Sequence, residues 1–64
     1  MGKPISLKAA RVDKGYTQED AAKLMGVGKD TIRNWEKGKT KISASNFQKL
    51  CSIYERSQAD IFLP

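Results

Sequence analysis

The stretch from Lys29 to Lys41 concentrates side chains whose chemistry matches the edges of DNA bases. It holds five of the chain's 12 Lys and Arg residues, opposed there only by Asp30 and Glu36. Arg and Lys suit the O6 and N7 acceptors of guanine, Asn suits the N6/N7 edge of adenine, and Asp accepts from N4 of cytosine. On a helix over residues 29–37, the outer face would present four candidate base-reading side chains: Lys29, Asp30, Arg33 and Asn34.

A second group of residues suits the sugar–phosphate backbone. A helix that begins near Gln18 would leave backbone N–H groups and the positive end of its dipole free for an anion. The Gln18 side chain can hold the same phosphate, and the basic loop after Gly38 supplies further donors. Such contacts set the register of a protein on DNA and carry no sequence information. The candidate phosphate-contacting residues are Thr17, Gln18, Lys37, Lys39, Thr40 and Lys41.

Residues 17–38 have the spacing of two short helices joined by a tight turn. Ala22 is small enough to let the second helix pack across the first. Gly26 can adopt a positive φ and end the first helix without a steric penalty. Ile32 returns to the core from the second helix. A small residue, a glycine and a β-branched apolar residue at these positions predict a helix-turn-helix.

Start and stop signals place the first three helices. The first runs over about 6–14, with Ser6 as its cap and a glycine at its end. Thr17 and Asp20 form a capping-box pattern at the start of the second. The third spans 29 to about 37, and Ile32 and Trp35 form its inward-facing pair.

Two further helices complete the expected fold. The fourth starts at Ser45, where Gln48 completes a Ser-x-x-Gln pattern, and its buried stripe includes Cys51 as a small apolar residue. Ser57 caps a short fifth helix that carries Ile61 and Phe62 into the core. We therefore predict an all-α fold, a compact five-helix bundle that forms one domain over residues 1–64, with the helix-turn-helix at about 17–38.

The length and composition of the chain argue against several classes of function. A chain of 64 residues buries only roughly 60% of its unfolded surface, too little for a deep enzyme cleft. It has no His and a single Cys, so we expect no internal disulfide, no metal site and no enzyme activity. We also expect no cofactor, no evident small-molecule ligand, no membrane partner and a cytoplasmic location. The net charge of +5 favours an anionic partner.

The chain resembles the lambda-repressor-like, XRE-type (Cro/C1-type) family of helix-turn-helix regulators over roughly residues 5–63. The resemblance rests on Arg11, the start Thr17-Gln18-Glu19, Gly26-Val27, Ile32, the run Trp35-Glu36-Lys37-Gly38, and the ending from Ser57 to Leu63. It implies double-stranded DNA as partner, with the helix over about 29–37 in the major groove. It also implies a structural ion pair between Arg11 and Glu36.

The function we expect is that of a transcriptional regulator, a repressor that binds a palindromic operator as a weak homodimer. Ile53 and Leu63, with Leu24 as a further candidate, supply the apolar surface for a second copy. The alternative is an antitoxin-type interaction module that also binds its own promoter. An RNA-binding module would display exposed aromatic residues, whereas here they fall on stripes expected to be buried. The sequence leaves open the operator, the regulated gene, activation versus repression, and any inducer.

Overall fold

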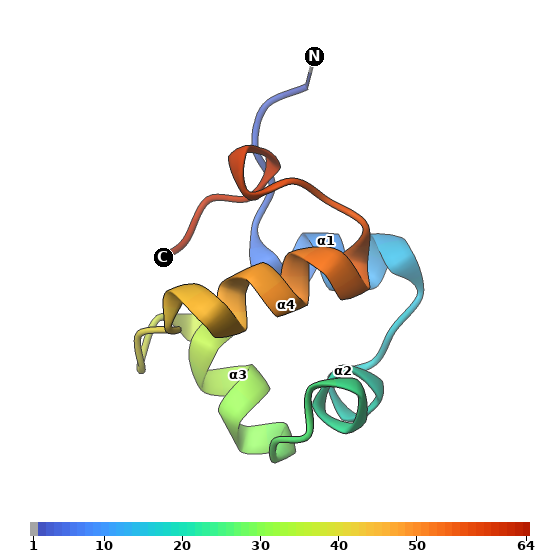
Figure 1. Cartoon of the computed structure of the whole chain (residues 1–64), viewed down its shortest axis with the longest axis vertical. Coiled ribbons are helices and arrows are strands. Elements are labelled where there is room, and N and C mark those ends of the chain that lie inside the picture. Colours follow the sequence, from blue (N-terminus) through green and yellow to red (C-terminus); the bar gives the residue numbers. More distant parts are fainter. Residues whose placement is uncertain (1) are drawn as a thin grey trace.

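Over residues 2–64, which the computed structural model describes, the chain folds into four α-helices and one short 3₁₀ turn (Figure 1). The helix-turn-helix pair, α2 and α3, lies at one end of the molecule, away from the N-terminal segment and the 3₁₀ turn. The elements in chain order are α1 (Leu7–Lys14), α2 (Gln18–Met25), α3 (Lys29–Lys37), α4 (Ala44–Tyr54) and η1 (Gln58–Asp60).

Local capping explains where the first three helices begin and end. The Ser6 hydroxyl accepts a hydrogen bond from the Ala9 N–H at 3.0 Å and starts α1. Thr17 and Asp20 form the predicted capping box at the start of α2, with both hydrogen bonds at 3.0 Å. Gly26 ends α2 at φ 73°, a conformation that only glycine adopts without strain.

The core lies where α4 packs against α1 and α2, and where α2 packs against α3. Leu7, Ile32 and Leu50 are its largest fully buried side chains. Trp35 is buried on the inner side of α3, and the free thiol of Cys51 is buried in α4, where burial raises its pKa. Since Ile32 and Trp35 fix the inward face of α3, its opposite face is left to solvent.

The fourth helix begins earlier than the sequence pattern indicated. Its cap is Ser43, whose hydroxyl accepts from the Asn46 N–H at 3.2 Å, and Ser45 lies inside the first turn. The preceding residue, Ile42, is partly buried against the core. This contact fixes where the loop ends, so the expected cap at Ser45 was wrong by two residues.

The predicted fifth α-helix is a single 3₁₀ turn. Asp60 does accept hydrogen bonds from the Ser57 N–H and hydroxyl, at 3.3 and 2.9 Å. The turn stops there because Ile61 is extended and forms a parallel bridge with Ile5. Successive side chains of an extended segment point to opposite sides. Ile61 is therefore buried, whereas Phe62 is 53% exposed and not in the core as expected.

Candidate nucleic-acid interface

The outer face of α3 carries the four side chains that the sequence nominated as base readers. Lys29, Asp30 and Arg33 are exposed, and Asn34 is partly buried. Gly28 caps the helix without any side-chain hydrogen bond, so no cap side chain occupies this end of α3. These side chains form a narrow polar face on the N-terminal half of α3. The opposite face of the helix packs in the core.

Two of these side chains are paired with each other. The Asp30 carboxylate lies 2.9 Å from the Arg33 guanidinium, one turn along α3. Both side chains are at least half exposed, and exposed ion pairs contribute only about 0–1 kcal/mol. The Arg33 guanidinium can therefore leave Asp30 for another acceptor with little loss of free energy. While the pair is formed, it restricts the direction in which the Arg33 side chain points.

The last turn of α3 is held in place by a buried ion pair. The Arg11 Nε lies 2.7 Å from the Glu36 Oε2, and Nη2 donates to Oε1 at 3.3 Å. The two side chains are only 8% and 6% exposed. Arg11 also donates to the Tyr16 carbonyl at 2.8 Å, just before α2. Burial, followed by the negative charge of Glu36, raises the pKa of the neighbouring Tyr54 to about 12.

Gln18 belongs to the same cluster, which the sequence did not indicate. Its side-chain amide donates to the Glu36 Oε1 at 3.1 Å and is partly buried. As the first residue of α2, its backbone N–H lies outside the helix's own ladder and is placed for an anion. The amide holds α2 to α3, so a phosphate contact through the side chain would require this bond to change. Thr17 is exposed, but its hydroxyl oxygen already accepts from the Asp20 N–H.

The other nominated phosphate contacts follow α3. Gly38 ends the helix at φ 75°, and the Lys39 N–H then donates to the Asn34 carbonyl at 2.9 Å. The chain changes direction at this cap, and the side chains at the end of α3 and in the following loop are polar and exposed to solvent. These exposed residues are Lys37, Lys39, Thr40 and Lys41.

The two flanks differ in how the chain holds them. The start of α2 is tied to α3 through Gln18 and Glu36, whereas the basic loop contacts the C-terminal segment. A β-carbon on Gly38 would lie 2.9 Å from the Pro64 side chain. The end of the chain therefore packs directly against the turn that starts the basic loop.

Comparison with known proteins agrees with this geometry. A family model described as helix-turn-helix matches residues 7–60, from the first residue of α1 to the last of η1. No curated protein sequence matches the chain. Among residues 2–64, none of the helices has the length and apolar character needed to cross a bilayer.

Proposed function

We propose that this chain, which belongs to the XRE, Cro and C1 type of the helix-turn-helix family, is a repressor that binds a palindromic operator as a dimer. The family is one of DNA-binding transcription regulators. The observation that carries the finer proposal is the outer face of α3. It holds Lys29, Asp30, Arg33 and Asn34 on a helix fixed from behind by buried Ile32 and Trp35.

Base recognition follows from this face. The major groove of B-DNA is about 12 Å wide and accepts one α-helix. In our proposal the N-terminal half of α3 enters it, with Arg33 and Lys29 donating to guanine and Asn34 bonding to adenine. Asp30 either accepts from cytosine or keeps its pairing with Arg33.

Phosphate contacts on both sides of α3 would set its depth in the groove. On one side we propose that a phosphate lies at the backbone N–H of Gln18, where the α2 dipole favours an anion, with Thr17 beside it. The Thr17 N–H already donates to the Asp20 carboxylate, so a phosphate contact of that N–H would require the capping box to open. On the other side we place the exposed loop residues Lys37, Lys39, Thr40 and Lys41. Because Gln18 bonds α2 to Glu36 of α3, the phosphate site at the start of α2 would keep a fixed position relative to α3.

Self-association would use apolar surface near the end of the chain. Phe62 and Leu63 are 53% and 43% exposed there, whereas the exposed Leu24 lies on α2. Ile53, nominated with Leu63, packs instead against the core and offers less surface than expected. With so few apolar side chains, we expect the interface to bury less than the roughly 1,200 Å² of a stable one, so the free dimer would be weak. DNA would then couple the two copies.

The test is a selection of bound sequences from random duplex DNA, followed by titration of the selected site. The proposal expects two half-sites about 34 Å apart along the duplex. A palindrome should bind more tightly than one of its half-sites. Equal affinities would show that the chain binds as a monomer and would contradict the dimer.

A further inference from the structure

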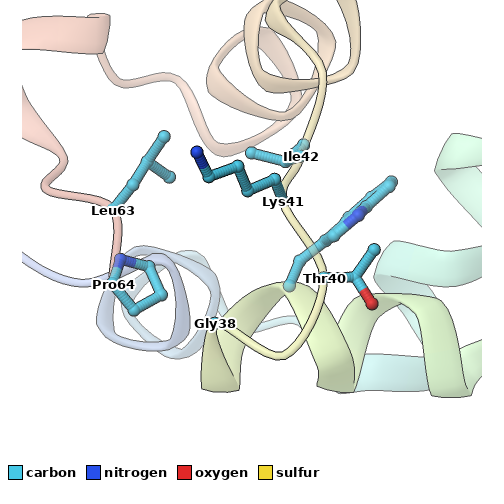
Figure 2. Close-up of a pocket in the computed structure, with 7 residues that line it drawn as sticks. Gly38, Thr40, Lys41, Ile42, Leu63 and Pro64 are labelled. Carbon is cyan, nitrogen blue, oxygen red and sulfur yellow. The ribbon is translucent and has the colours of Figure 1, made fainter.

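Asp30 is the one exposed carboxylate within the basic segment from Lys29 to Lys41. The other acidic side chain of this segment, Glu36, is buried in its pair with Arg11. The loop over residues 39–43, where Lys41 lies, carries no acidic side chain (Figure 2). A surface that only held phosphates would bind DNA more tightly without the Asp30 charge, because like charges repel each other. The contacts of Asp30 on α3 indicate a different role.

Asp30 contacts Arg33 on the outer face of α3. Its Oδ1 lies 2.9 Å from Nη2 of Arg33, and the two side chains are 79% and 50% exposed. Asp30 also lies in the first turn of α3, where the positive end of the helix dipole favours a carboxylate. The helix and the guanidinium therefore both stabilise the Asp30 charge at this position.

The pair with Asp30 leaves Arg33 able to bind guanine. A guanidinium carries five N–H donors in a rigid planar fork, and bonds to O6 and N7 of guanine use two of them. Nη2 has two hydrogens, so it can donate one to Asp30 and the other to the base. One guanidinium can therefore bind the carboxylate and the guanine at the same time.

From this geometry we infer that Asp30 is a positioning residue, which holds the Arg33 guanidinium in the orientation that reads one guanine of the operator. The inference rests on the proposed function, in which the outer face of α3 enters the major groove. It assigns the Asp30 carboxylate to Arg33 and not to a cytosine.

The pair contributes more to recognition than to stability. In the free chain both side chains are in contact with water, so the pair adds little to the stability of the fold. Entry into the groove removes water from the pair, and the lower dielectric strengthens the attraction. A side chain that is already oriented loses less conformational freedom when its base contacts form. Asp30 therefore favours the one base toward which Arg33 points.

Selection of bound sequences from random duplex DNA with matched variants tests this role. A bidentate contact between Arg and guanine discriminates by about 5- to 150-fold against another base. Asp30→Ala should lower this discrimination by about fivefold at one guanine position. Arg33→Ala should abolish the preference at the same position. The double variant should lose no more than Arg33→Ala, because Asp30 acts through Arg33.

Glu19→Ala is the matched control for charge. Glu19 is an exposed carboxylate in the first turn of α2, as Asp30 is in the first turn of α3. Loss of either charge should tighten binding to a duplex of random sequence by about twofold, because repulsion of phosphate is reduced. Only Asp30→Ala should relax the preference for guanine.

Two further measurements separate positioning from folding. Asp30→Glu can still pair with Arg33 three residues away and should keep the guanine preference within about twofold of that of the unaltered chain. Urea denaturation should give nearly the same free energy of unfolding for Asp30→Ala as for the unaltered chain, because the lost pair is exposed.

The outcomes distinguish this inference from the proposed function. Unaltered base preference in Asp30→Ala, or an equal relaxation in Glu19→Ala, would overturn the positioning role. Relaxation at a position that Arg33→Ala leaves unaltered would show that Asp30 reads a base itself, which also overturns it. In these cases the chain still selects a DNA site and the proposed function stands. If the unaltered chain selects no duplex sequence, the proposed function fails and this inference fails with it.

Discussion

The side-chain amide of Gln18 donates to the Glu36 carboxylate at 3.1 Å, joining the first residue of α2 to the last turn of α3. Glu36 is at the same time bound to Arg11 of α1. One buried carboxylate therefore positions three helices, among them the two that would touch DNA. The bond from Gln18 to Glu36 links the proposed phosphate site on α2 to the proposed base-reading face on α3, and the ion pair with Arg11 holds Glu36 in place for it.

Removal of this carboxylate should be strongly destabilising. Glu36→Ala leaves the buried Arg11 charge without a counter-charge, which is expected to lower the free energy of unfolding by about 3–5 kcal/mol. Urea denaturation followed by circular dichroism would measure the loss. Asp13→Ala is the control because it breaks an exposed pair with Arg56, for which about 0–1 kcal/mol is expected. Similar losses in both variants would show that the Glu36 pair contributes no more than a surface pair.

The same cluster shows which features local sequence patterns can predict. Ser6, Thr17 and Gly26 act on residues three or four positions away, so the bounds of α1 and α2 followed from their types. The bond between Gln18 and Glu36 spans 18 positions. It depends on how α2 and α3 cross, and no local signal could have revealed it.

Two of the errors in the second half of the chain have the same origin. Ser43 and Ser45 are equally good caps by type, and the partial burial of Ile42 decides between them. Ser57 and Asp60 carry a correct helix-start pattern, but the bridge between Ile5 and Ile61 ends the helix after one turn. In each case a contact distant in sequence overrode a local preference.

Alanine substitutions of Asn34 and Lys39 should weaken DNA binding in different ways. Asn34→Ala removes a proposed base contact, which is expected to cost about 1–3 kcal/mol and to relax preference at one operator position. Lys39→Ala removes a proposed phosphate contact and should weaken all sequences to a similar degree. Binding selections on both variants would separate the two effects. An unaltered base preference in Asn34→Ala would place that side chain outside the recognition surface.

Affinity for duplex DNA should depend steeply on salt. If a dimer neutralises about 6–10 phosphates, the affinity should fall by about 10³–10⁵ between roughly 50 and 200 mM salt. Titrations of one selected site at four or five salt concentrations would give the slope. The Lys39→Ala variant should reduce that slope by about one unit, whereas Asn34→Ala should leave it unaltered. A flat dependence would be incompatible with a binding surface built on the basic loop.

Gly38 and Gly15 form a natural pair for testing the contact between the end of the chain and the basic loop. Both residues cap a helix in the left-handed conformation, at φ 75° and 88°. Alanine at either position should cost about 1–2 kcal/mol of stability for that conformation alone. A β-carbon at Gly15 would meet no atom within 4 Å, whereas one at Gly38 would lie 2.9 Å from Pro64.

Gly38→Ala should therefore be the more destabilising of the two, because the C-terminal segment must also shift. Since the same turn starts the loop of Lys39 and Lys41, this variant should lose DNA affinity as well, and Gly15→Ala should not. Parallel denaturation curves and DNA titrations of the two variants would measure both effects. Removal of Pro64 in the Gly38→Ala background should restore stability to the level of Gly15→Ala. If it does not, the extra loss arises within the turn itself and the packing of Pro64 is not its cause.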